Sequence, residues 1–107
     1  MKLISATELA SWLADGKRER PLLLDVREPW ENAICRIEGS ELVPMRDVAA
    51  RLAALDTDRP IVCICHLGGR SAHAAVFLER QGCADVYNLT GGVEAWRHDV
   101  DPTMTKY

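Results

Sequence analysis

The sequence has no hydrophobic run long enough to cross a membrane. Its apolar runs, such as Ile61–Cys65, are five residues or shorter, whereas a membrane-spanning helix needs about 20 apolar residues in succession. We also expect no secretory signal, because the N-terminus carries one lysine and reaches Glu8 and Asp15 before any long apolar segment. We therefore expect a cytoplasmic location and no membrane association.

Clusters of basic residues are also absent. The chain has 16 Asp and Glu against 13 Lys and Arg, a net charge of −3 with neutral histidines, and its arginines are scattered from Arg18 to Arg97. A nucleic-acid partner normally requires a concentrated basic face. We therefore expect no binding to RNA or DNA.

Linkers, repeats and low-complexity tracts are missing too. Because 107 residues is the usual size of one domain, the sequence predicts a single domain over residues 1–107. No metal-ligand spacing is formed by the four cysteines at 35, 63, 65 and 83 and the three histidines at 66, 73 and 98. Without a secretory signal, free thiols are favoured over a disulfide framework.

Short apolar runs alternate with segments of helical periodicity. Strands are predicted at 2–4, 22–25, 61–64 and 85–89, an extended piece at 40–43, and helices at 5–16, 29–33, 47–55, 71–81 and 93–97. This alternation is typical of an α/β fold in which helices cover a parallel sheet. The run at 61–64 is the strongest strand signal, so we expect it at the centre of the sheet.

One loop carries the residue types that point to chemistry. Residues 65–71, Cys-His-Leu-Gly-Gly-Arg-Ser, separate the predicted central strand from an apolar helix, and ligands of a parallel sheet bind outside the carboxyl ends of its strands. A glycine-rich loop can turn its backbone N–H groups inward and form an anion-binding nest at the start of the next helix. Such a nest, the helix N-terminus and Arg70 would favour the thiolate form of Cys65. Cys65 is therefore the candidate nucleophile.

At these residues the sequence resembles the rhodanese family of sulfurtransferases. Further segments that are similar to the family's motifs are Leu23–Glu28, the turn bracketed by Gly39 and Pro44, and Thr90-Gly91-Gly92 with Trp96. The resemblance covers nearly the whole chain. It implies a five-stranded parallel sheet with helices on both faces, and Cys65 as the catalytic residue.

The resemblance further implies a two-step transfer of sulfur. The Cys65 thiolate attacks the outer sulfur of a small anionic donor such as thiosulfate, sulfite leaves, and cyanide or a thiol then removes the sulfur from the persulfide. A protein that accepts sulfur is a further candidate partner, and no metal, nucleotide or flavin cofactor is required. Substrate would be held by the residues that follow Cys65, namely His66, Leu67, Gly68, Gly69, Arg70 and Ser71. Arg70 could instead point away from the loop and brace the start of the helix.

Two departures from the family pattern concern the attraction of thiosulfate. His66 stands where the loop often has Arg or Lys, and Cys35-Arg36-Ile37 stands where many members have Gly-His-Ile. A neutral histidine adds no charge, so affinity for the dianion depends on whether Arg36 faces the loop.

Asp25 and Arg27 lie at the carboxyl end of the predicted strand at 22–25. We interpret them as an internal hydrogen-bonded pair that supports the residues in contact with substrate. The alternative is a solvated pair on the surface. Trp30 is expected either at the rim of the pocket or in plain packing. The polar segment 101–107 has no periodicity, so we expect a tail that is either docked or frayed.

Three other functions stay open on the sequence. Phosphatases and arsenate reductases with related loops place five residues between the cysteine and the arginine, but only four separate Cys65 from Arg70. A loop shorter by about 3.5 Å of chain suits one sulfur atom better than a tetrahedral oxyanion. A noncatalytic rhodanese-type binding module is disfavoured by the intact Cys65 and Arg70. A thiol redox enzyme would use Cys63 with Cys65, although neighbouring positions of one strand are poorly placed for a disulfide.

Overall fold

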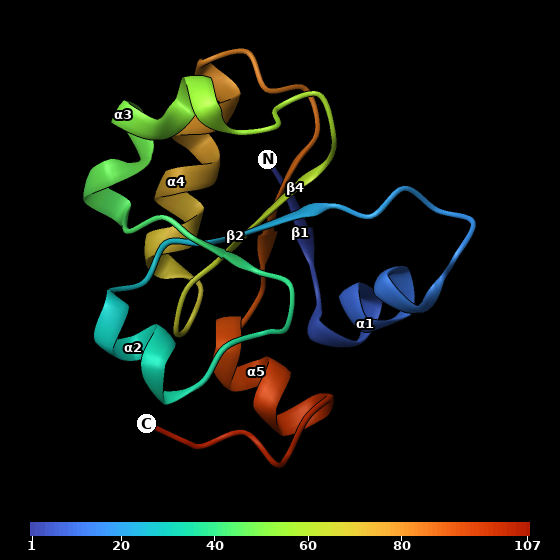
Figure 1. Ribbon diagram of the computed structural model, residues 1–107. Coiled ribbons are helices and arrows are strands. Elements are labelled where there is room, and N and C mark those ends of the chain that lie inside the picture. Colours follow the sequence, from blue (N-terminus) through green and yellow to red (C-terminus); the bar gives the residue numbers. More distant parts are fainter.

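Strands and helices alternate along the chain in the computed structural model, which describes residues 1–107 (Figure 1). The strands are β1 (Lys2–Ile4), β2 (Leu22–Asp25), β3 (Glu41–Leu42), β4 (Ile61–Ile64) and β5 (Val86–Leu89). The α-helices are α1 (Ala6–Ala14), α2 (Pro29–Ile34), α3 (Val48–Arg51), α4 (Gly69–Arg80) and α5 (Gly92–Asp99). Two 3-10 helices, Met45–Asp47 and Leu52–Ala54, flank α3. No helix is long and apolar enough to span a membrane.

The five strands form one sheet in the order β1-β5-β4-β2-β3, and every neighbouring pair is parallel. This confirms the predicted parallel α/β fold and the central position of β4. All four residues of β4 and all four of β2 are buried, as expected for strands that are covered by helices on both faces.

Helices cover both faces of the sheet, with α3 and α4 on one side and α1 and α5 on the other (Figure 1). Successive residues of β2 point to opposite faces, so Leu22 and Leu24 join the apolar cluster under α3 and α4, while Leu23 joins the cluster under α1 and α5. Trp12 and Trp96 pack within this second cluster. The two cores lie between the sheet and its helices and leave the carboxyl end of the sheet free for a site.

The helix predicted over 47–55 is shorter in the structure than expected. Only Val48–Arg51 is α-helical, and the following turn tightens into a 3-10 helix in which the Leu55 N–H donates to the Leu52 carbonyl at 3.1 Å. The apolar spacing was nonetheless a correct sign of packing, because Val48 and Leu55 are both buried in the cluster under α4. A 3-10 turn brings residues three apart onto one side, so the same side chains reach the core without a continuous α-helix.

Candidate active site

Cys65 lies directly after β4, at the carboxyl end of the central strand. Gly68 has a left-handed backbone with φ of 107° and precedes the first residue of α4, Gly69. A residue with a Cβ adopts this conformation only with strain, so the glycine permits the sharp turn from strand to helix. The loop predicted at 65–71 therefore connects β4 to the first turn of α4.

The start of α5 holds the backbone of this loop. The Val93 N–H donates to the carbonyl of Cys65 at 2.9 Å, and the Glu94 N–H donates to the carbonyl of His66 at 3.2 Å. Gly92, with φ of 59°, packs so closely that a Cβ there would collide with both carbonyls. The motif Thr90-Gly91-Gly92 thus positions the loop that carries Cys65.

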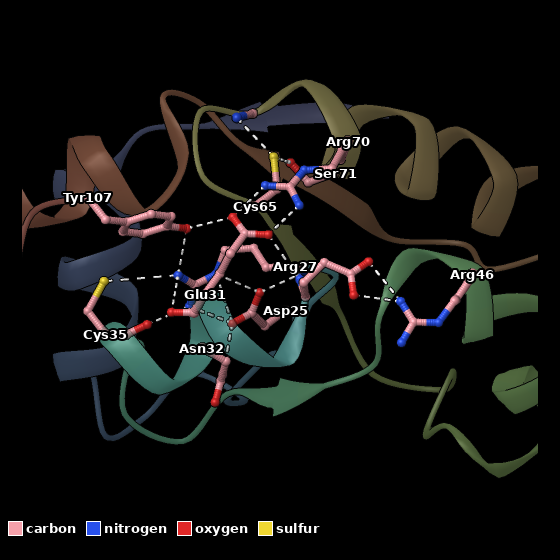
Figure 2. Close-up of polar contacts among 12 residues, drawn as sticks. Asp25, Arg27, Glu31, Asn32, Cys35, Arg46, Cys65, Arg70, Ser71 and Tyr107 are labelled. Atoms are coloured by element: carbon pink, nitrogen blue, oxygen red, sulfur yellow. Dashed lines mark hydrogen bonds and ion pairs between the residues drawn. The ribbon is translucent and has the colours of Figure 1, made fainter.

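The sulfur of Cys65 is buried and has two polar neighbours. The residue is 1% exposed, the Gly68 N–H donates to Sγ at 3.0 Å, and the Ser71 hydroxyl lies 3.2 Å from it (Figure 2). The Ser71 hydroxyl also lies 2.5 Å from Oδ1 of Asn88, whose Nδ2 donates to the Gly68 carbonyl at 3.0 Å. Asn88 on β5 therefore fixes both groups that contact the sulfur.

The expected nest of amides is only partly directed at Sγ, because Gly68 is the one backbone donor that reaches it. The N–H groups of Gly69, Arg70 and Ser71, in the first turn of α4, donate to no protein acceptor. Free amides of this kind, at the positive end of a helix, attract negative charge. They remain available for an atom beyond Sγ.

Arg70 binds a carboxylate. Its guanidinium donates to the two oxygens of Glu31 on α2 at 2.6 and 2.8 Å, which links the start of α4 to α2. Both roles expected for Arg70, a contact with substrate and a brace of the helix, stay predictions. The hydrogen bond from Arg70 is the main reason that the pKa of Glu31 is lowered to about 2. The Arg70 charge is thus paired, and the site is less positive than the sequence suggested.

Asp25 and Arg27 form the predicted internal pair, and the solvated alternative is wrong. Arg27 is fully buried and Asp25 is 1% exposed, with Arg27 Nη2 2.7 Å from Asp25 Oδ2. Arg27 also donates to the carbonyls of Glu31 and Cys35, and Asn32 donates to Asp25 Oδ2. The pair therefore holds the middle and the C-terminal end of α2, the helix that carries Glu31.

The tail is docked, and its last residue reaches the site. Tyr107 stacks on His66 with ring centroids 4.0 Å apart and planes 13° apart, and its hydroxyl accepts from Arg27 Nη1 and donates to Glu31 Oε2, each at 2.9 Å. Trp30 is 62% exposed and packs edge-on against Tyr107. Trp30 therefore lies on the rim of this cluster rather than in a core.

Arg36 does not join the loop. It is exposed and lines a hollow of about 660 Å³ beside α1 and α5, and none of residues 65–71 lines that hollow. The next residue, Ile37, is buried in the cluster under α1 and α5, which draws this segment to that face of the sheet. Arg36 therefore does not face the loop, and the charge that it would have added there is absent from the site.

The other thiols lie in packing positions. Cys63 is fully buried next to the apolar residues under α4, and burial raises its pKa to about 12. Burial also raises the pKa of Cys83. All four cysteines are free, and no group of three metal-ligating side chains occurs.

Comparison with known proteins places this arrangement in a family. The family model of the Rhodanese-like domain matches residues 5–99. The thiosulfate sulfurtransferase GlpE of Pseudomonas aeruginosa is 41% identical over 75 residues, which are 70% of this chain and 68% of that relative. The probable adenylyltransferase/sulfurtransferase MoeZ of Mycobacterium tuberculosis is 37% identical over 97% of this chain, which spans about a quarter (26%) of the length of MoeZ.

Solved structures agree with this placement. A rhodanese-like domain protein from Staphylococcus aureus superimposes with a TM-score of 0.83 at 29% identity and covers 100% of this chain and 99% of its own. The chain belongs to the rhodanese-like domain family. The resemblance that the sequence suggested is confirmed, as is the fold that it implied.

Three residues of this site were not foreseen from the sequence: Glu31, Asn88 and Tyr107. Asn88 gave a usable signal, because a polar residue between the apolar Tyr87 and Leu89 of a buried strand needs a hydrogen-bonding partner. Glu31 and Tyr107 gave none, since both meet their partners only after the chain has folded.

Proposed function

We propose that the protein is a sulfurtransferase in which Cys65 carries the transferred sulfur as a persulfide. In the first step the Cys65 thiolate attacks the outer sulfur of thiosulfate, a Cys65–sulfur bond forms, and the bond between the two sulfurs of thiosulfate breaks as sulfite leaves with its electron pair. In the second step a nucleophile such as cyanide attacks the outer sulfur and the Cys65 thiolate leaves. Each step is a displacement at sulfur.

The observation that carries this proposal is the position of Cys65 Sγ at the N-terminus of α4. The Gly68 N–H, which donates to Sγ at 3.0 Å, would stabilise negative charge on the sulfur. The free N–H groups of Gly69, Arg70 and Ser71 would then bind the outer sulfur of the persulfide, which carries its negative charge. His66 and Leu67 complete the loop around the sulfur.

The proposed sulfur donor is thiosulfate or a persulfide. The proposed physiological acceptor is a thiol, and cyanide is the acceptor in the assay. The GlpE relative is a thiosulfate sulfurtransferase by name, which supports the donor. MoeZ is named as a probable adenylyltransferase and sulfurtransferase in one chain. This name supports a protein as a further candidate acceptor. No cofactor enters the proposed steps.

Phosphate chemistry is the less favoured alternative. Only four residues separate Cys65 from Arg70, and the Arg70 guanidinium is occupied by Glu31 rather than directed at a place for a phosphate. A redox role for Cys63 is disfavoured because a thiol with a pKa of about 12 forms little thiolate at neutral pH. A noncatalytic binding role is less favoured because it does not require the polar contacts made to the Cys65 sulfur.

A steady-state assay distinguishes these functions. The wild type should form thiocyanate from thiosulfate and cyanide, and Cys65→Ser should not. Cys83→Ser is the matched control, because Cys83 lies outside the loop, and it should retain the activity. Hydrolysis of an aryl phosphate by a wild type that forms no thiocyanate would favour the phosphatase alternative instead.

A further inference from the structure

The tail of the chain reaches the Cys65 loop from outside the segment that the family model matches. The match ends at residue 99, whereas Tyr107 stacks on His66, the residue that follows Cys65. Between residue 99 and Tyr107 the tail forms a turn in which the Met104 N–H donates to the carbonyl of Asp101 at 3.1 Å. The contact of Tyr107 with the loop is therefore a feature of this chain that the family match does not include.

Tyr107 is anchored by groups that are themselves rigid. Its hydroxyl accepts from Arg27, which is fully buried, and donates to Glu31, which is 3% exposed. Burial raises the pKa of Tyr107 to about 12, so the hydroxyl keeps the proton that it donates. Figure 2 shows the carboxylate of Glu31 between the Tyr107 hydroxyl and the Arg70 guanidinium, and the same oxygen, Oε2, accepts from both.

The residue that carries the sulfur, Cys65, is enclosed. Cys65 is 1% exposed, and none of the three hollows of the structure includes it in its lining. The stacked rings of Tyr107 and His66, with Trp30 edge-on against Tyr107, form a continuous aromatic wall beside the loop. The wall is joined to the loop through His66, the residue that follows Cys65.

We propose that Tyr107 is a specificity-determining residue that limits sulfur acceptors to small molecules, and this inference rests on the proposed sulfur transfer. In the acceptor step a thiolate attacks the outer sulfur of the Cys65 persulfide, the bond between that sulfur and Cys65 Sγ breaks, and the Cys65 thiolate leaves with the electron pair. The attacking thiolate becomes the new persulfide. Displacement at sulfur needs the attacking atom to approach along the breaking bond. On this proposal the wall beside His66 narrows that approach and excludes bulky thiols first.

Two substitutions distinguish the effect of the Tyr107 ring from the effect of its hydrogen bonds, and a third is a control. Tyr107→Ala removes the ring and should admit bulky thiols. Tyr107→Phe retains the ring stacked on His66 but loses both hydrogen bonds, so the wall should be present but less firmly held. Thr105→Ala is the matched control, because Thr105 is an exposed residue of the same tail and should leave acceptor choice unchanged.

The test uses protein that already carries the persulfide. After loading with thiosulfate and removal of the excess, rate constants for sulfur removal are measured with 2-mercaptoethanol and with a neutral cysteine-containing peptide amide, two thiols that differ in size. Tyr107→Ala should raise the peptide-to-mercaptoethanol ratio about tenfold, and Tyr107→Phe by a smaller factor. A change in stability alone would alter both rate constants together. A ratio that stays within about twofold of wild type in Tyr107→Ala would overturn the proposal.

A second readout does not depend on sulfur transfer. Alkylation of Cys65 by iodoacetamide and by a bulky fluorescein maleimide is followed by peptide mass, and Tyr107→Ala should accelerate only the bulky reagent. If the wild type takes up no sulfur while alkylation changes in this way, the proposed function fails and the access role of Tyr107 stands. If the wild type takes up sulfur and neither ratio changes, the access role fails and the proposed function stands.

Discussion

Arg70 and Glu31 form a two-pronged ion pair across 39 residues of sequence, with Nη1–Oε1 and Nη2–Oε2 distances of 2.6 and 2.8 Å. Glu31 is nearly enclosed, with a side chain 5% exposed, whereas that of Arg70 is 41% exposed. Arg70 lies in the loop of Cys65 and is the cation best placed to attract an anionic sulfur donor. Because it is already paired, Glu31 competes with the donor for it.

This competition predicts that Glu31→Gln improves the use of thiosulfate. The substitution retains the size of the side chain and removes its charge, which frees Arg70 for the dianion. We expect the KM for thiosulfate to fall about fivefold in a steady-state assay with cyanide. The free energy behind this change is a small part of the interaction energy of two unit charges at the Arg70–Glu31 distance. Glu41→Gln, which breaks the exposed pair with Arg51, should not change KM. An unchanged KM in Glu31→Gln would contradict the competition.

The Arg70–Glu31 pair also predicts how stability depends on pH. The pKa of Glu31 is about 2 in the folded protein against an ordinary value of 4.5, mainly because Arg70 donates to it. A pKa lowered by folding stabilises the protein above the ordinary value, and this stabilisation is lost as the pH falls from about 4.5 toward 2. Urea unfolding should therefore show wild type more stable than Glu31→Gln by about 2 to 3 kcal/mol at pH 7. The difference should shrink steadily below about pH 4.5, and a constant difference would show that the ionised pair contributes nothing.

Asp25→Ala should destabilise the protein strongly. Arg27 is fully buried and Asp25 is the carboxylate that neutralises it, so removal of Asp25 leaves a buried charge without its partner. We expect a loss of about 3 to 5 kcal/mol in the free energy of unfolding, measured by urea denaturation. Glu41→Ala removes one partner of an exposed ion pair and should cost less than about 1 kcal/mol. Equal effects of the two substitutions would be incompatible with a structural role for the buried pair.

Gly92→Ala should disturb the Cys65 loop from behind. Gly92 has φ of 59°, and a Cβ there would meet the carbonyls of Cys65 and His66, so the loop must shift. We expect a lower melting temperature by calorimetry together with a lower rate of thiocyanate formation. Gly16→Ala, where a Cβ meets nothing within 4 Å, should leave both unchanged. Full activity of Gly92→Ala would mean that the loop tolerates the displacement.

The sequence was sufficient to predict the sheet and the place of Cys65 at the end of its central strand because both depend on neighbouring residues. The run Ile61–Ile64 is apolar on both faces and indeed forms the buried central strand. Gly68 and Gly69 mark the turn that brings Cys65 to the N-terminus of α4. Patterns of this kind can be recognised from a short segment of sequence, without knowledge of contacts between distant residues.

The sequence could not predict the charge balance around Cys65. That balance depends on contacts between distant positions, such as Tyr107 with Arg27, 80 residues apart. The position of Arg36 was left open for the same reason, because the burial of Ile37 in the cluster under α1 and α5 decides where its neighbour lies. Side-chain pairing across the fold has no periodicity along the chain from which it could be predicted.

Uptake of sulfur by Cys65 tests the central claim most directly. Each protein is incubated with thiosulfate, separated from the donor without reductant, and its intact mass is measured. The wild type and Cys63→Ser should both gain the mass of one sulfur atom, which cyanide then removes, and Cys65→Ser should gain none. Sulfur retained by Cys65→Ser, or lost in Cys63→Ser, would contradict the assignment of Cys65 as the residue that carries it.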